Sequence, residues 1–240
     1  MVCISLTSIP SRFKYLPAIV AQLLKLHPTC PVYVCIPDTY RRWMNDPVTP
    51  PDLSMLGPRV KVLRGKDYGP ATKFLAPALE VSEDETIVYL DDDTAYPPTL
   101  VDTLTQFEGV VGLSGFTLEE YFEGCVTRGH LKRVDVIEGY GGVAIPARIL
   151  KNNFQEIVSL LDLTYNDDMA LSNFLEKISV PKRTVFLSDC HIGLVKQYQY
   201  GFEADALHFN NGEGSHITNN KRILSAFALK NVNYFTYNAR

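Results

Sequence analysis

The sequence predicts an α/β protein built on a mostly parallel β-sheet. In its first half, short apolar runs of strand type alternate with segments whose apolar residues recur at helical spacing. Strands that alternate with helices indicate βαβ units, and such units build parallel sheets. The chain has 240 residues and 46% hydrophobic content, which is ordinary globular composition, and no change of composition divides it. We therefore expect one domain over residues 1–240.

The first half provides the regular part of this pattern. Gly69 and Pro70 stand where the second helix would start, and Pro98 suits the first turn of the third. Apolar runs predict strands, and apolar positions at helical spacing predict helices, as follows: strands at 2–6, 32–36, 60–63 and 86–90, and helices at 16–24, 74–79 and 100–107.

The second half is less regular. Strands are expected at 110–115, 134–137 and 141–145, and helical spacing recurs over 150–161 and 171–178. Asp167 and Asp168 stand at the start of the last helix. After residue 196 the chain turns polar, and residues 210–214 predict a flexible loop.

Charge and cysteine content exclude several classes of protein. Net charge is −4, and the basic residues are scattered, so we expect no nucleic-acid partner. No apolar run approaches the roughly 20 residues of a membrane span, and residues 2–6 are typical of a strand rather than a secretory signal. We therefore expect a cytoplasmic protein. The five cysteines form no C-x-x-C pair, which favours buried free thiols: Cys3, Cys30, Cys35, Cys125 and Cys190.

An acidic triplet, Asp91, Asp92 and Asp93, directly follows the strand expected at 86–90. Open α/β sheets bind ligands outside the carboxyl ends of their strands. Three adjacent carboxylates repel one another, and a hard divalent cation held together with water and diphosphate oxygens would neutralise them. Strand alternation would place Asp91 and Asp93 on one side as the ligand pair. The alternative is a solvated turn whose acids cap the next helix.

Five motifs carry a resemblance to a known family. In chain order they are Ser8–Arg12, Asp67–Lys73, Tyr89–Asp93, Gly139–Gly142 and Asn166–Asp168. In this order and spacing the chain resembles GT-A-type glycosyltransferases with a DxD motif, in particular small enzymes encoded by large algal DNA viruses (chloroviruses) and their bacterial relatives. The resemblance implies a single GT-A domain with a mixed, mainly parallel central sheet, a nucleotide-binding half over residues 1–100 and an acceptor-binding half over 101–240 that ends in a flexible segment.

The resemblance also implies an activity. It is the metal-dependent transfer of a sugar from a nucleotide-sugar donor, most commonly a UDP-sugar, to a hydroxyl of a glycan or glycoprotein acceptor. A viral member would act in the host cytoplasm.

For the nucleotide, the resemblance points to the loop after the first strand, to Tyr68 at the base and to Lys73 at the phosphates. Lys73 lies near the start of a helix, whose dipole attracts anions. Solvated or packed side chains remain the alternative for Arg12, Lys73 and Tyr68. The full nucleotide set is Thr7, Ile9, Arg12, Tyr68, Lys73, Asp91, Asp92 and Asp93.

For the acceptor, the resemblance implies that a carboxylate at the last helix start removes the proton of the attacking hydroxyl. We expect Asp168 to be this base in an inverting reaction and Asp167 to contact a sugar hydroxyl. Tyr140, Gly141 and Gly142 would border the donor sugar and acceptor, because glycine allows close approach of the backbone. Helix capping by the two acids and a tight turn at the glycines are the alternatives.

For the metal, the resemblance implies Mn²⁺ or Mg²⁺ on Asp91 and Asp93, with a C-terminal histidine as third ligand. His208 is favoured over His216, and a surface histidine is the alternative.

Two other functions stay open on the sequence. A nucleotidyltransferase would also bind a metal and phosphates, but it usually has a glycine-rich loop after the first strand, whereas residues 7–12 contain no glycine. A nucleotide- or carbohydrate-binding module without catalysis would keep the acidic triplet and would not need Asp168.

Overall fold

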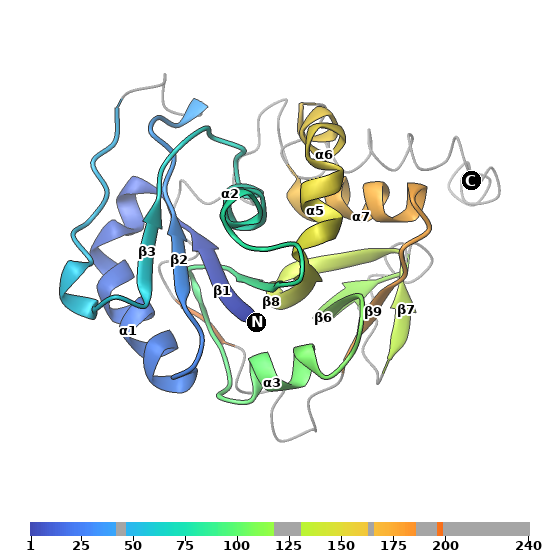
Figure 1. Ribbon diagram of the computed structural model, residues 1–240, viewed down its shortest axis with the longest axis horizontal. Coiled ribbons are helices and arrows are strands. Elements are labelled where there is room, and N and C mark those ends of the chain that lie inside the picture. The colour runs from blue at the N-terminus through green and yellow to red at the C-terminus, as the bar shows by residue number, and fades with distance from the viewer. Residues whose placement is uncertain (42–46, 118–130, 163–165, 186–195, 199–240) are drawn as a thin grey trace, which may run out of the picture.

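The computed structural model describes residues 1–41, 47–117, 131–162, 166–185 and 196–198. An eight-stranded mixed sheet forms its centre (Figure 1). In spatial order the strands are β3 (Val60–Leu63), β2 (Val32–Cys35), β1 (Val2–Thr7), β4 (Thr86–Leu90), β8 (Val136–Pro146), β6 (Val110–Phe116), β9 (Lys182–Thr184) and β7 (Lys132–Val134).

The pairing of these strands confirms the predicted mixed, mainly parallel sheet. Strands β3, β2, β1 and β4 pair in parallel, as does β6 with β9. Strand β8 is antiparallel to both of its neighbours, and β7 is antiparallel to β9. Of the eight strands that the described residues contribute to this sheet, only β8 and β7 therefore run against the rest. A separate short ribbon pairs β5 (Thr94–Ala95) with β10 (Lys196–Gln197).

Helices cover both faces of the sheet (Figure 1). One face carries α2 (Thr72–Glu80), α5 (Ala147–Asn152), α6 (Phe154–Leu161) and α7 (Asp167–Lys177), and the other carries α1 (Leu16–Leu26) and α3 (Leu100–Thr105). Two short 3-10 helices, η1 (Pro10–Tyr15) and η3 (Ser54–Leu56), complete the elements used below.

Strand alternation divides the core into two layers. Along β1, Cys3 packs in the layer under α2 and α7, whereas Ile4 and Leu6 pack in the layer under α1 and α3. The same division holds in β4, where Tyr89 and Leu90 point to opposite layers. Strands buried on both faces explain why the sequence shows continuous apolar runs there rather than polar alternation.

Strand β8 differs from its prediction. The sequence indicated two strands, 134–137 and 141–145, with a tight turn at the glycine pair as one alternative, but Val136–Pro146 is one continuous strand. Its pairing with β6 shifts between Gly112, opposite Val143, and Ser114, opposite Glu138. Residues 139–142 therefore form a bulge within one strand, and Gly141 and Gly142 do not form a tight turn between two strands. The helical stretch predicted over 150–161 is likewise divided, into α5 and α6.

Three cysteines, Cys3, Cys30 and Cys35, are buried free thiols, as predicted. Cys125 and Cys190, the two C-terminal histidines considered as ligands and residues 210–214 lie outside the described residues. Across the described ranges, no helix combines the length and the apolar character that crossing a membrane requires.

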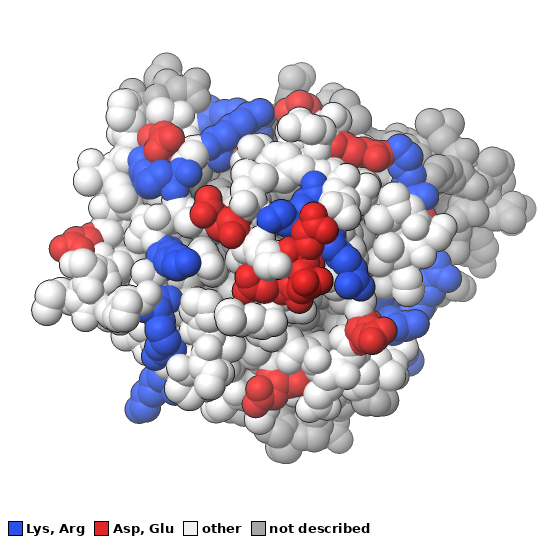
Figure 2. Space-filling model, viewed as in Figure 1, with Lys and Arg blue, Asp and Glu red and all other residues white. Residues whose placement is uncertain are grey.

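Charged side chains on one face of the molecule are intermixed (Figure 2). Lys and Arg side chains lie in separate small groups on this face, and Asp and Glu side chains gather near its middle. The exposed turn between α2 and β4 contributes acidic side chains, Glu83 and Asp84 among them. These acids are solvated and lie at the amino end of β4, away from the acidic triplet at its carboxyl end.

Candidate active site

The acidic triplet lies where the strand order reverses. From β1 the chain proceeds to β2 and β3 on one side, and it returns on the other side of β1 as β4. The carboxyl ends of β1 and β4 therefore flank the switch point at which open α/β sheets bind ligands. Ser8 follows β1 there, and Asp91–Asp93 follow β4. The structure thus brings together two of the motifs on which the resemblance depends.

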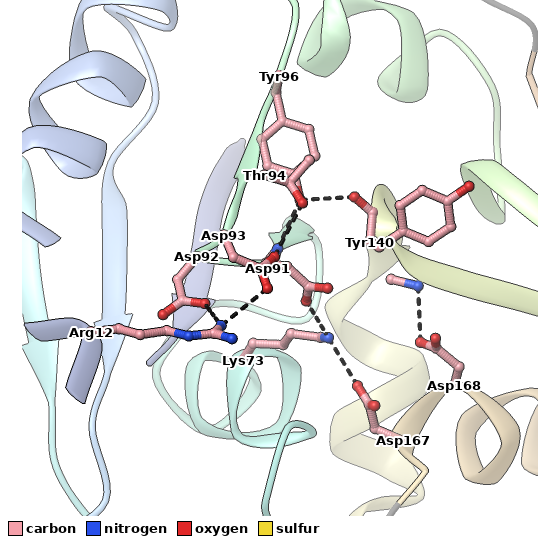
Figure 3. A network of polar contacts seen from close by, with 11 residues as sticks. Arg12, Lys73, Asp91, Asp92, Asp93, Thr94, Tyr96, Tyr140, Asp167 and Asp168 are labelled. Carbon is pink, nitrogen blue, oxygen red and sulfur yellow. Dashed lines mark hydrogen bonds and ion pairs between the residues drawn. The ribbon is translucent and has the colours of Figure 1, made fainter. Parts of the chain in front are cut away.

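Arg12 is the counter-ion of two of the three acids (Figure 3). It lies in η1, with only 7% of its surface exposed, and its Nη1 is 2.7 Å from Asp92 Oδ1 and 3.1 Å from Asp93 Oδ2. Ser8 Oγ donates to the other oxygen of Asp92 at 2.5 Å. Burial raises the pKa of Asp92 to about 6, although Arg12 and Ser8 lower it. Arg12 thus holds the loop after β1 against the triplet.

Lys73 is the counter-ion of the third acid and of an acid from a distant segment. It is the second residue of α2, and its Nζ lies 2.7 Å from Asp91 Oδ1 and 3.0 Å from Asp167 Oδ2 (Figure 3). The residue is 3% exposed. Burial lowers the pKa of Lys73, but the attraction of Asp167, Asp91 and Asp168 outweighs it, so that the pKa is raised well above its usual value. The ammonium is therefore charged at neutral pH.

The triplet does not continue the strand. Strand β4 ends at Leu90, and Asp92 and Asp93 lie in a turn. Strand alternation therefore does not extend to these residues: Asp91 contacts Lys73, whereas Asp92 and Asp93 share Arg12. Protein cations already offset part of the repulsion that suggested a metal.

The two acids of α7 are free of a capping role. Asn166 caps the helix, and its side-chain oxygen accepts a hydrogen bond from Met169 N at 3.0 Å. The alternative that Asp167 or Asp168 caps α7 is therefore wrong. Asp168 Oδ1 instead accepts from Gly139 N at 2.9 Å (Figure 3). Burial, followed by the charges of Asp167, Asp91 and Glu138, raises the pKa of Asp168 well above its usual range, against the opposing charge of Lys73.

A tyrosine hydroxyl connects the triplet to the bulge of β8. Tyr96 Oη accepts a hydrogen bond from Asp91 N at 2.9 Å and donates to Tyr140 O at 3.0 Å. The Tyr140 side chain is 40% exposed, and its hydroxyl lies 2.9 Å from Ser114 Oγ. Ser114 Oγ is in turn 2.6 Å from Glu138 Oε2. Tyr140, which was predicted to border the substrate, therefore lies on a hydrogen-bonded rim beside the acids.

Gly139, rather than the glycine pair, adjoins the charged groups. A Cβ on Gly139 would lie 2.9 Å from Lys73 Nζ and 3.0 Å from Asp168 Oδ1. A Cβ on Gly142, whose φ is +84°, would lie 2.9 Å from Leu90 Cδ2, and one on Gly141 would lie 3.1 Å from Ser114 Cβ. Close packing against neighbouring protein atoms thus explains why residues 141 and 142 are glycines.

The remaining predicted nucleotide residues surround this centre less directly. Thr7 Oγ1 donates to Cys35 O at 2.7 Å, which ties the ends of β1 and β2 together. Ile9 is the residue before η1. Tyr68 is half-buried, and its ring meets that of Phe154 edge-on at 5.6 Å between centroids. His208 falls outside the described residues.

Four site residues were not assigned a role from the sequence: Ser8, Tyr96, Ser114 and Glu138. Ser8 begins the quoted Ser8–Arg12 motif and Glu138 directly precedes the quoted Gly139–Gly142 motif, so their positions gave a signal. Ser114 depends on strand pairing that spacing does not reveal, since it faces Glu138 only through the register of β6 and β8.

The carboxylates suit a hard divalent cation only in part. Among the described residues, no three His, Cys, Asp or Glu side chains gather as a metal centre. The Asp91 side chain is 30% exposed, and Asp93 Oδ1 accepts a hydrogen bond from the neighbouring Thr94 hydroxyl at 3.2 Å. Oxygen ligands of this type fit Mg²⁺ or Mn²⁺ when water and diphosphate oxygens complete the coordination.

No protein-family model and no curated protein sequence matches the chain. Among solved structures it is similar to the glycosyltransferase GlyE of Streptococcus pneumoniae, with 15% identity, a TM-score of 0.44 and coverage of 79% of this chain but 46% of GlyE. It is also similar to the galactosyltransferase LgtC in complex with donor and acceptor sugar analogs, with 10% identity, a TM-score of 0.48 and coverage of 94% and 96%. An active-site mutant of LgtC gives 11% identity and a TM-score of 0.47 over 77% of this chain and 72% of the mutant. Likenesses this distant do not establish an activity.

Proposed function

We propose that the chain is a metal-dependent glycosyltransferase of the GT-A type. It moves a sugar from a nucleotide-sugar donor, a UDP-sugar in the first instance, to a hydroxyl of a glycan or glycoprotein, with inversion. One observation carries the proposal: an acidic triplet and an acidic pair more than seventy residues apart, Asp91–Asp93 and Asp167–Asp168, meet at the switch point of the sheet. A transferase needs one acidic group at a diphosphate and another at the attacking hydroxyl.

The arrangement of charges supports this division of roles. Asp91, Asp92 and Asp93 follow β4, next to the loop after β1 that the resemblance assigns to the nucleotide. Asp167 and Asp168 come from α7 and lie beside the bulge that carries the exposed Tyr140. The donor would occupy the first side and the acceptor the second, with Lys73 between them.

Asp168 is the residue best suited to remove the acceptor proton. Gly139 N orients its carboxylate, and burial among other acids raises its pKa toward the working range of a general base. In the proposed reaction the acceptor oxygen attacks the anomeric carbon, the bond to the nucleoside diphosphate breaks, and Asp168 takes the hydroxyl proton. Asp167 would contact a sugar hydroxyl.

A divalent cation, held by Asp91 and Asp93, would stabilise the negative charge of the diphosphate leaving group. The remaining ligands would come from water, the diphosphate and the predicted C-terminal histidine. Lys73 pairs with Asp91 and Arg12 pairs with Asp93, so the chain's own contribution is to hold these two carboxylates in place before the donor arrives.

Calorimetric titration of UDP and GDP, with and without Mn²⁺, tests the proposal. We expect UDP to bind only with Mn²⁺ and the binding to disappear in Asp93→Ala, because the variant removes one metal-binding carboxylate. Asp84→Ala, in the exposed turn before β4, is the matched control and should bind UDP normally. Metal-independent UDP binding would contradict the metal assignment. If neither nucleotide bound, the transferase proposal would fail.

A synthesis assay separates the two rival functions. A nucleotidyltransferase would release pyrophosphate from UTP and a sugar phosphate, whereas a glycosyltransferase would release UDP from a UDP-sugar. A binding module would release neither product while it still bound the nucleotide.

A further inference from the structure

Lys73 does not lie as a phosphate ligand is expected to lie. Its side chain is 4% exposed, and its Nζ contacts two carboxylates, at 2.7 Å on Asp91 and at 3.0 Å on Asp167. A move of the ammonium away from Asp167 toward a phosphate would leave the Asp167 carboxylate, whose side chain is 10% exposed, buried without its partner. Such an uncompensated buried charge is strongly unfavourable.

The same ammonium joins three separate elements. Lys73 belongs to the first turn of α2, Asp91 follows β4, and Asp167 opens α7. Lys73 Nζ and Asp168 Oδ1 both border Gly139, at 2.9 and 3.0 Å from the position of a Cβ built on it, so the two side chains are neighbours without forming an ion pair. One cation therefore stands between the donor-side acids and the acceptor-side acids.

Lys73 is also the cation that faces Asp168. The titratable and charged groups of the described residues that act on Asp168 come from each surrounding element: Lys73 from α2, Tyr89 from β4, Asp91 from the segment after β4, Glu138 from β8 and Asp167 from its own helix. Of these, only Lys73 favours the ionised carboxylate, because each of the other charges is acidic.

We propose that Lys73 is a positioning residue for proton removal, whose ammonium ties the first turn of α7 to the acidic triplet and favours the ionised form of Asp168, instead of binding the donor phosphates. The inference rests on the proposed function, because Asp168 has to be the base for its ionisation to matter. It assigns to Lys73 a role different from the one that the resemblance implied.

Carbon-13 NMR of the Asp168 carboxyl in the full chain, without nucleotide or metal, tests the electrostatic part. Lys73→Met keeps the length of the side chain and removes its charge. We expect the titration midpoint of Asp168 to rise by about one pH unit or more, because the variant removes the nearby opposite charge that favours the ionised carboxylate. Lys73→Arg, which keeps the charge, should leave the midpoint nearly unchanged. Asp168→Asn assigns the signal. An unmoved midpoint in Lys73→Met overturns the proposal.

A second pair of variants covers the case in which Lys73→Met does not fold. Asp167→Asn and Lys73→Met/Asp167→Asn both lack the Asp167 charge, so the double variant leaves one unpaired carboxylate fewer in the interior. The Asp168 midpoint should be higher in the double variant than in Asp167→Asn, again by about one pH unit. Equal midpoints in the two variants would overturn the proposal as well.

Nucleotide affinity and rate distinguish positioning from phosphate binding. In Lys73→Met we expect UDP affinity with Mn²⁺ to stay within about threefold of the wild type, whereas the acidic limb of the transfer rate moves to higher pH with the NMR midpoint. A loss of UDP affinity of about 100-fold with an unmoved acidic limb would make Lys73 a phosphate ligand. If the wild-type chain transferred no sugar, the proposed function would fail, while the NMR midpoints would still report whether Lys73 ionises Asp168.

Discussion

Asp168 differs from the other acids of the site in its surroundings. Asp92 and Asp93 share the guanidinium of Arg12, and Asp91 and Asp167 share the ammonium of Lys73. Asp168 accepts a hydrogen bond from a backbone amide, and in the described part of the chain it forms no ion pair at contact distance. A carboxylate held in place by a neutral donor remains free to accept a proton, which is what a general base requires.

Replacement of Asp168 by Asn should therefore separate binding from catalysis. The amide keeps the shape and the hydrogen-bond acceptor but cannot take a proton, so we expect transfer from a UDP-sugar to fall by about 100-fold or more. UDP affinity with Mn²⁺ should stay near that of the wild type, because Asp168 lies on the acceptor side. Rate and calorimetric measurements on the same preparation check both parts.

Asp84→Asn makes the same chemical change in the exposed turn before β4 and should retain full activity. Full activity in Asp168→Asn would remove Asp168 from the role of base. An equal loss of UDP affinity and of rate would instead indicate that the variant disturbs the donor side.

At the scale of single elements, α7 shows how a cap positions a site. Because Asn166 satisfies the amide of Met169, both following acids are available for Lys73 and Gly139. Capping by the two acids was an open alternative on the sequence because Asn, Asp and Ser are all good capping residues, and spacing alone does not decide among neighbours.

Asn166→Ala tests this capping role. We expect a loss of about 1 kcal/mol in the free energy of unfolding, since an N-cap side chain stabilises a helix by that order. Asn166→Asp restores an oxygen acceptor at the same position and should recover most of the loss. Urea unfolding followed by circular dichroism measures both variants. Wild-type stability in Asn166→Ala would show that another group satisfies the helix end.

Strand β8 marks the limit of prediction by pattern at this scale. Its two halves were recognised from their apolar residues, but the link between them was not, because glycines usually signal a turn. The bulge exists because four residues of β8 lie between the partners of Gly112 and Ser114, and this requires knowledge of β6. Pairing across the sheet is not encoded in the local sequence of either strand.

At the scale of the whole molecule, the first half was predicted well and the second half less well. Strands β1, β2 and β4 are buried on both faces, so that their apolar runs identify them without ambiguity. The short strands β7 and β9 have three residues each and gave no such pattern. Likewise the motifs identified most of the charged groups of the site, but not that Arg12 and Lys73 pair with acids from other segments. Ion pairs across the chain follow from tertiary packing, which spacing cannot show.

The stability of the whole fold should depend on pH through a residue remote from the site. His27 ends α1, its side chain is 5% exposed, and its Nε2 has no hydrogen-bond partner among the described residues. Burial lowers the pKa of His27 below its ordinary 6.5, although Asp102 raises it. Below pH 6.5 the unfolded chain therefore binds a proton that the folded chain resists, and stability falls as pH decreases through this range.

His27→Phe removes this titration while it keeps a buried ring of similar size. We expect the difference in free energy of unfolding between wild type and His27→Phe to be constant above about pH 7 and to shift against the wild type at lower pH, by at most about 1.4 kcal/mol per pH unit. Asp92 acts in the opposite sense, because its raised pKa of about 6 makes stability fall as pH rises from 3.8 toward that value. Both proteins contain Asp92 and Asp168, so these contributions cancel in the difference. Urea unfolding of both proteins from about pH 5 to about pH 8 measures this difference in free energy of unfolding. A difference that stays constant over the whole range would show that His27 is protonated as readily in the folded chain as in the unfolded chain.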